Sequence, residues 1–194
     1  LAARADQIKL GDPMEQTTQM GPVISQVALG RCHQFIATAR AEGARQVAGA
    51  QALALTGEFA NGYYIRPTIF ADVHPDHQLF QDEVFGPVIS ITRFETDEQA
   101  VALANTGDFG LGVSIWSRDI ARAHRLSRHI RGGIIWLNDH HRNDPRSVWG
   151  GVKDSGFGKE NGWDALRGYL SKKSVVIRTE PGYDDWFAGS NRYG

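Results

Sequence analysis

The sequence predicts an α/β fold with a parallel sheet, because short apolar runs alternate with amphipathic segments through its middle. The runs have the length of strands and are almost continuously apolar, as strands buried on both faces are; they cover residues 88–94, 112–116 and 133–137. Thr96 and Gln99 form a capping box that opens a helix ending at Ala104, and Asp119 opens a second helix to Ile130. This order of strands and helices predicts parallel strands joined by right-handed crossovers.

The first third of the chain predicts two helices and two extended pieces. One helix covers residues 1–10, and Ser25 caps another that runs to about Gly43. The inner face of the second helix follows from helical spacing and consists of Ala28, Cys32, Phe35, Ile36 and Ala39. Extended pieces follow at residues 46–48 and 63–70. Cys32 therefore has apolar neighbours and is expected in the core, where cysteine behaves as a small hydrophobe, and not as a nucleophile.

The composition is that of a soluble globular protein, and 194 residues fit one domain with a sizeable core or one domain plus an appendage. Its 21 lysines and arginines nearly balance its 22 aspartates and glutamates, so we expect no nucleic-acid or membrane partner. No apolar run reaches membrane-spanning length, and the first residues lack the pattern of a signal peptide. A single cysteine cannot form an internal disulfide, which favours a reducing compartment and a cytoplasmic location.

The EVFGP segment (residues 83–87) is the first candidate ligand site. One carboxylate, on Glu83, can accept hydrogen bonds from both hydroxyls of a ribose diol. The nearby ring of Phe85 offers a flat apolar wall to a planar group. From the residues alone, a helix-to-strand turn with a surface glutamate and a core phenylalanine is the favoured interpretation.

The 138–160 loop is the second candidate site, since ligands of parallel sheets gather beyond the carboxyl ends of the strands. It carries Asp139, His140, Asn143 and Trp149, followed by several glycines. The glycines match neither a P-loop, because Phe157 stands where that motif needs lysine, nor a dinucleotide fingerprint. Adjacent histidines seldom converge on one ion, so we expect no metal site and interpret the loop as the lining of a pocket.

Four segments together resemble the aldehyde dehydrogenase superfamily, in its order: EVFGP at 83–87, NTGDFGL at 105–111, GIIWLN at 133–138 and WGGVKDSGFGKE at 149–160. The resemblance covers roughly residues 1–180 and only the C-terminal part of such an enzyme. It implies an incomplete, Rossmann-like, three-layer α/β catalytic domain over residues 1–170. It further implies a C-terminal oligomerisation strand and tail over residues 171–194.

The resemblance also implies a chemistry, the oxidation of an aldehyde to a carboxylic acid with NAD or NADP through a cysteine thiohemiacetal. Glu83 would hold the nicotinamide ribose and Phe85 the nicotinamide ring. Trp149 would line the substrate pocket, together with Asp139, His140 and Asn143 at positions that vary with substrate. Their polarity suggests a polar or aromatic aldehyde. The family's catalytic cysteine lies upstream of the matched region, so we expect this chain to lack it and to be inactive alone.

Residues 174–179 predict a β segment flanked by Lys172, Lys173 and Arg178. In the resembled enzymes the matching strand pairs with a neighbouring subunit, which implies a homo-oligomer or a partner that supplies the missing N-terminal half. The alternative function is therefore a non-catalytic α/β module that assembles through this strand. The tail, residues 181–194, has four aromatic residues but little pattern.

Overall fold

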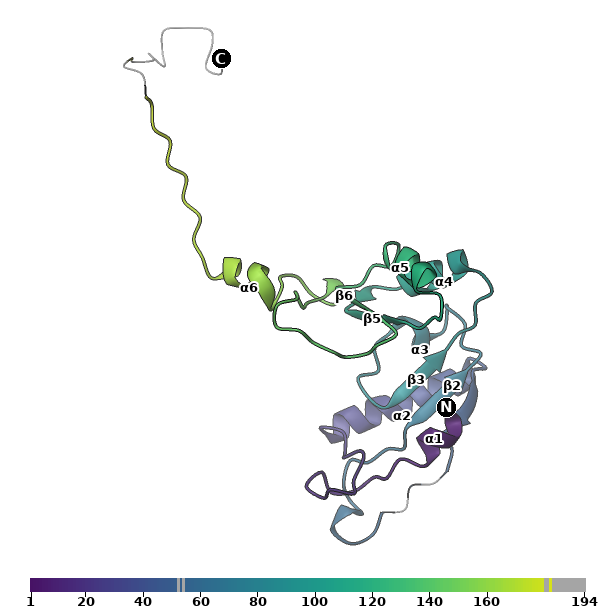
Figure 1. Ribbon diagram of the computed structural model, residues 1–194. Coiled ribbons are helices and arrows are strands. Elements are labelled where there is room, and N and C mark those ends of the chain that lie inside the picture. The colour runs from purple at the N-terminus through teal and green to yellow at the C-terminus, as the bar shows by residue number, and fades with distance from the viewer. Residues whose placement is uncertain (52, 54, 180–181, 183–194) are drawn as a thin grey trace.

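The computed structural model describes residues 1–51, 53, 55–179 and 182, and it has the predicted mixture of helices and strands (Figure 1). Its first sheet has the order β1-β2-β3, formed by Arg45–Ala48, Thr68–Ala71 and Val88–Ile91. β1 runs antiparallel to β2, whereas β2 and β3 are parallel, with Thr68 opposite Val88. Both predicted extended pieces are thus present, although the second forms a strand only from Thr68 onward.

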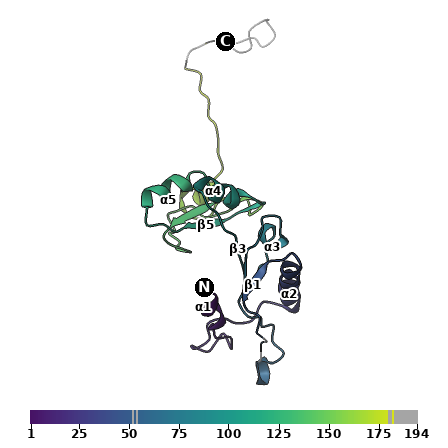
Figure 2. The same ribbon diagram turned by 90° about the vertical axis from the view of Figure 1, so that its right-hand side faces the viewer.

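Side chains of β2 alternate between two apolar layers, one on each face of this sheet. Figure 2 shows a helix on either side of the sheet. Ile69 packs with Ala5 beneath the short helix α1 (Ala2–Asp6). Phe70 packs on the other face, beneath α2 (Gln26–Ala41). Four of the five residues predicted for the inner face of α2 are buried, Cys32, Phe35, Ile36 and Ala39, whereas Ala28 is only half-buried. The predicted first helix is too long, because the structure ends it at Asp6.

The second group of strands consists of two separate pairs, one parallel and one antiparallel. β5 (Gly112–Ile115) runs parallel to β6 (Ile134–Leu137), and α5 (Ile120–Ser127) connects them. Two strands of two residues each, β4 (Phe109–Gly110) and β7 (Val152–Lys153), form a separate antiparallel pair. Three further short helices are η1 (Gly57–Phe59), α3 (Gln78–Gln81) and α6 (Gly162–Gly168).

The prediction of one continuous sheet through all three central strands is wrong in this chain. β3 belongs to the sheet with β2, whereas β5 belongs to the sheet with β6. The alternation of strands and helices fixes the type of each element, but it does not fix which strand lies beside which. The earlier segment Thr68–Ala71 supplies β2, and β2 pairs with β3.

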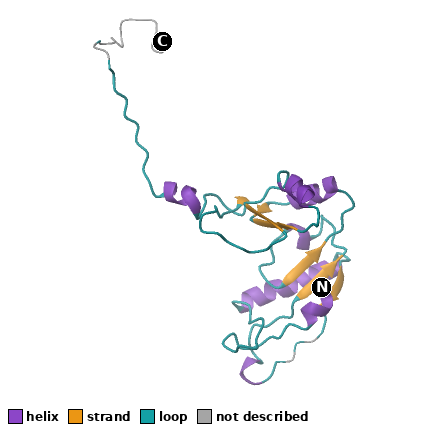
Figure 3. Cartoon of the chain, in the orientation of Figure 1, coloured by secondary structure: helices purple, strands orange, loops and turns teal. Residues whose placement is uncertain are grey.

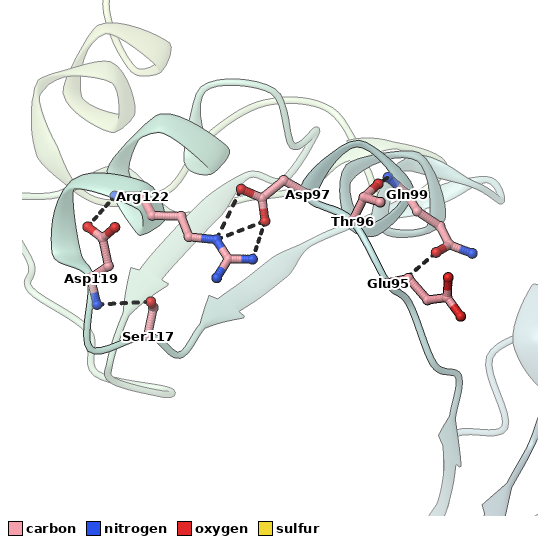
Figure 4. Close-up of polar contacts among 7 residues, drawn as sticks. All are labelled: Glu95, Thr96, Asp97, Gln99, Ser117, Asp119 and Arg122. Carbon is pink, nitrogen blue, oxygen red and sulfur yellow. Dashed lines mark hydrogen bonds and ion pairs between the residues drawn. The ribbon is translucent and has the colours of Figure 1, made fainter.

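As predicted, polar side chains cap the N-termini of the two helices that precede β4 and β6 (Figure 4). α4 (Asp97–Asn105) begins after Thr96, whose hydroxyl accepts a hydrogen bond from the Gln99 amide at 3.2 Å. The Gln99 side chain accepts from the Glu95 amide at 2.8 Å, one residue before the partner expected in a capping box. In α5, Asp119 accepts from the Arg122 amide at 2.9 Å.

An ion pair connects these two helix starts (Figure 4). The Arg122 guanidinium donates Nε to both carboxylate oxygens of Asp97, at 2.8 and 3.0 Å. These hydrogen bonds lower the pKa of Asp97 and raise the pKa of Arg122. Because Arg122 is exposed and Asp97 is only half-buried, solvent weakens the pair, which orients α4 against α5 more than it stabilises them.

Residues 171–179 contain no strand, although the sequence predicts one at 174–179 (Figure 3). They extend away from the other elements, and Val175, Val176 and Ile177 are 71%, 93% and 76% exposed. A strand needs a hydrogen-bonded partner, and the rest of the described chain does not supply one here. Pairing with another chain stays a prediction, and the aromatic residues of the predicted tail lie outside the described residues.

Candidate functional site

The EVFGP segment presents Glu83 and Phe85 to solvent on either side of a buried valine. Val84 is 7% exposed and belongs to the core beneath α2, whereas Phe85 is 76% exposed. The φ angle of Phe85 is +54°, so the backbone is left-handed there. The interpretation of Phe85 as a core residue is therefore wrong, and its ring faces outward.

Glu83 and Phe85 line one cleft, which has a volume of about 540 Å³. Its walls include the end of α4, the strands β4 and β5, and residues 154–155 of the 138–160 loop. Three carboxylates, on Asp82, Glu83 and Asp154, and one guanidinium, on Arg131, line it, so the acidic groups outnumber the basic ones. The apolar part of the lining includes Phe80, Phe109, Leu111 and Val113. The cleft thus combines acidic hydrogen-bond acceptors with aromatic surface.

Close packing on α2 fixes the next residue of the segment, Gly86. A Cβ atom built on Gly86 would lie 2.3 Å from Sγ of Cys32, so only glycine fits against the sulfur. Cys32 is fully buried, and this burial raises the pKa of its thiol. The prediction that Cys32 is a core residue is confirmed.

The 138–160 loop brings three aromatic rings close to Trp136 on β6. His140, His141 and Trp149 lie 5.7, 6.3 and 6.0 Å from the Trp136 ring, measured between centroids. The Trp136 indole donates to the carbonyl of Arg142 at 2.8 Å, which ties the loop to the strand. His140 shares a 2.8 Å hydrogen bond with the hydroxyl of Ser114 on β5. We call Trp136, His140, His141 and Trp149 the ring cluster.

The four predicted substrate-lining residues are only partly brought together. His140 and Trp149 both contact Trp136 in the ring cluster. Asp139 is half-buried and accepts a hydrogen bond from the His140 amide at 2.8 Å, whereas Asn143 is exposed. None of the four is among the residues that line the cleft of Glu83 and Phe85. The described residues therefore form two separate candidate surfaces.

Sequence reasoning missed two groups of site residues. Trp136 lies inside an apolar strand, where nothing distinguishes it from a core residue. Arg131 and Asp154 reach the cleft through chain folding that no local pattern encodes. The left-handed φ angles at Asn138, His141 and other described non-glycine residues of the loop are likewise invisible in the sequence.

Two features, a metal-binding group and a membrane-spanning helix, are absent from the described residues. They contain no group of three or more histidine, cysteine, aspartate or glutamate side chains arranged to hold a metal ion. None of their helices has the length and apolar content needed to cross a bilayer.

Comparison with known proteins decides the family. A sequence model of the aldehyde dehydrogenase family matches residues 1–175. The chain belongs to the aldehyde dehydrogenase family. Betaine aldehyde dehydrogenase of Cereibacter sphaeroides is 42% identical over 181 residues, covering 93% of this chain and 36% of that protein. Aminoaldehyde dehydrogenase 1, peroxisomal, of Pisum sativum is 37% identical over 183 residues, covering 94% of this chain and 36% of that protein.

Crystal structures of aldehyde dehydrogenases confirm the α/β fold class. Betaine aldehyde dehydrogenase from Staphylococcus aureus in complex with NAD+ has a TM-score of 0.88 and 34% identity. The likeness covers 97% of this chain and 37% of that structure. The chain thus spans about 36% of the length of the curated relatives that it matches.

Several residues of the aldehyde dehydrogenase motifs bind backbone groups in this structure. Asn105 donates to the carbonyl of His129 and accepts from the amide of Arg131, both at 2.7 Å. Asn138 bonds both backbone groups of Ser117 at 2.8 Å. Two lysines of the 138–160 loop similarly cap carbonyls: Lys153 those of 105 and 107, and Lys159 those of 150 and 151. These motif residues therefore shape the loops that present the site.

Proposed function

We propose that this chain is part of an enzyme that oxidises an aldehyde to a carboxylic acid with NAD or NADP. The observation that carries the proposal is the pair Glu83 and Phe85, both exposed and both lining one acidic cleft in an aldehyde dehydrogenase fold. The relative from Staphylococcus aureus, of 34% identity, was crystallised with NAD+. The complete enzyme, its substrate and its cofactor are inferred from these findings.

The residues of the cleft fit the nicotinamide end of the cofactor. Glu83 offers a carboxylate that can accept hydrogen bonds from two ribose hydroxyls. Phe85 offers an exposed ring face, and the neighbouring carboxylates of Asp82 and Asp154 favour the positive charge of an oxidised nicotinamide. When bound, the cofactor supplies the acceptor for the hydride that leaves the substrate. The role of this chain is to hold and orient that acceptor.

The ring cluster and Asp139 fit a small aldehyde with a polar or cationic group. Aromatic rings attract ammonium groups, and a nearby carboxylate adds to that attraction. The relatives named above are a betaine aldehyde dehydrogenase and an aminoaldehyde dehydrogenase. Trp149 would form one wall of the substrate site, with His140 and Asn143 at its polar edge. We propose a cytoplasmic location, because the single cysteine of the sequence is free and a reducing compartment favours free thiols.

The cysteine nucleophile of this chemistry would come from outside these 194 residues. Cys32 is the one cysteine of the sequence, and it is enclosed in the core against Gly86. A thiolate is the reactive form of cysteine, and burial raises the pKa of this thiol. The purified chain, given NAD and betaine aldehyde, should therefore produce no NADH above the blank. NADH formation that needs the aldehyde, and that disappears in Cys32→Ala, would contradict this assignment.

A second candidate function is assembly without catalysis, and the exposed apolar residues at 175–177 favour it. Through backbone hydrogen bonds, an extended segment can add as a new strand to the edge of a sheet in another chain. We propose that residues 174–179 do so, either in a homo-oligomer or with a chain that supplies the rest of the family domain. Sedimentation of the same preparation would then show a species larger than a monomer, and a variant ending at Leu170 would be monomeric.

A further inference from the structure

We propose that Arg31 is a positioning residue that holds the EVFGP segment in the conformation that presents Glu83 and Phe85. The proposal rests on the proposed cofactor role of these two residues. It concerns a side chain on α2 that is 52 positions away in sequence and that lies outside the lining of the cleft. Arg31 therefore acts on the site through the backbone of the segment, and not by touching the cofactor.

The segment needs support because its functional side chains are exposed. Glu83 and Phe85 point outward, so Val84 is the residue between them whose side chain the core holds. A φ angle of +54° at Phe85 is an uncommon conformation for a phenylalanine, which persists only where the surroundings impose it. Without an external restraint, the backbone would relax toward conformations that turn the carboxylate and the ring apart.

Arg31 supplies such a restraint by binding the backbone of the segment. Its Nη2 donates a hydrogen bond to the carbonyl oxygen of Glu83. The guanidinium lies over the ring of Phe35, with its central carbon 5.9 Å from the ring centroid. Because Phe35 is buried in the α2 core, this contact fixes the arginine and, through it, the carbonyl. The planar, always charged group can stack and donate at the same time.

The next residue of α2 contacts the segment three residues further along. Cys32 packs against Gly86, directly after Phe85, whereas Arg31 binds the carbonyl of Glu83, so consecutive residues of α2 hold the segment on both sides of Phe85. Removal of the Cys32 side chain would open the core, but Arg31 is exposed and can be replaced without a cavity. Arg40 on the same helix is a matched control, since its Nε binds Gln46 at 2.8 Å, away from the segment.

The test uses the full chain and four versions of it: wild type, Arg31→Met, Arg31→Lys and Arg40→Met. Backbone order parameters of residues 83–86 report rigidity directly. We expect about 0.85 in the wild type and a fall toward 0.6 in Arg31→Met. Affinity for nicotinamide mononucleotide, the probe, should fall about fivefold in Arg31→Met, as for the loss of one typical hydrogen bond. Arg31→Lys should recover part of both, and Arg40→Met should match the wild type.

The outcomes separate this proposal from the proposed function. Unchanged order parameters in Arg31→Met, or an equal loss in Arg40→Met, would overturn the positioning role whatever the probe does. A loss of order in Arg31→Met alone supports the positioning role even if the wild type binds no nucleotide. In that case it is the assignment of Glu83 and Phe85 to a cofactor that fails. Thermal unfolding at an unchanged temperature in all four versions excludes a general loss of stability.

Discussion

Replacement of Gly133 by alanine is expected to unfold the part of the chain that contains β5 and β6. A Cβ atom at this position would lie 1.7 Å from the carbonyl oxygen of Gly150 and 3.1 Å from that of Leu111. Both obstacles are backbone atoms, so no side-chain rotation relieves the clash. Gly133 also donates to the carbonyls of Gly110 and Leu111, at 3.1 and 3.0 Å. We expect a loss of about 3–5 kcal/mol in the free energy of unfolding.

Urea denaturation followed by tryptophan fluorescence measures this loss, because Trp136 reports on β6. Gly30→Ala is the matched control: Gly30 lies inside α2, and an added Cβ meets nothing within 4 Å. Alanine there should stabilise the helix by up to about 1 kcal/mol. If Gly133→Ala unfolds at the same urea concentration as the wild type, the close approach of residues 133 and 150 does not exist in solution.

Replacement of Gly86 by alanine is expected to cost about 2–4 kcal/mol, and Cys32→Ala is expected to relieve part of that cost. The added Cβ would lie 2.3 Å from Sγ of Cys32, which is fully buried and cannot move aside freely. Cys32→Ala alone should cost about 1 kcal/mol, because it removes one buried atom. In the double variant, the new methyl group occupies the space that the sulfur leaves.

A double-mutant cycle measures this compensation, with the free energy of unfolding determined for wild type, both single variants and the double variant. We expect the double variant to be more stable than the sum of the single effects predicts, by at least about 1 kcal/mol. Additive effects would show that the EVFGP segment does not pack on α2 through this contact. They would also remove one of the two restraints that hold Phe85 in place.

Local patterns in the sequence predicted the elements but not their partners. The face of α2 follows from apolar residues at helical spacing, and Ser25 and Asp119 begin helices because their side chains accept backbone amides. The pairing of β3 with β2, and the two-residue strands β4 and β7, depend on contacts between distant segments. The β segment at 174–179 has strand composition, but composition cannot supply the neighbouring strand that it needs.

The candidate site was predictable only where a motif carried it. Glu83 and Phe85 were found by resemblance, since a carboxylate two residues from a ring is common in ordinary turns. Trp136 and Arg31 were missed because one lies in an apolar strand and the other acts across 52 residues of sequence. Left-handed backbone at Phe85 has no sequence signal, since phenylalanine rarely adopts it.

Titration of the isotope-labelled chain with nicotinamide mononucleotide tests the cofactor assignment most directly. We expect saturable changes in the amide resonances of residues 83–86, with a dissociation constant in the millimolar range that suits a partial site. Glu83→Ala should abolish them through loss of the diol acceptor, whereas Glu98→Ala, an exposed carboxylate on α4, should leave them intact. Resonance changes confined to other regions, or equally strong in Glu83→Ala, would contradict the account.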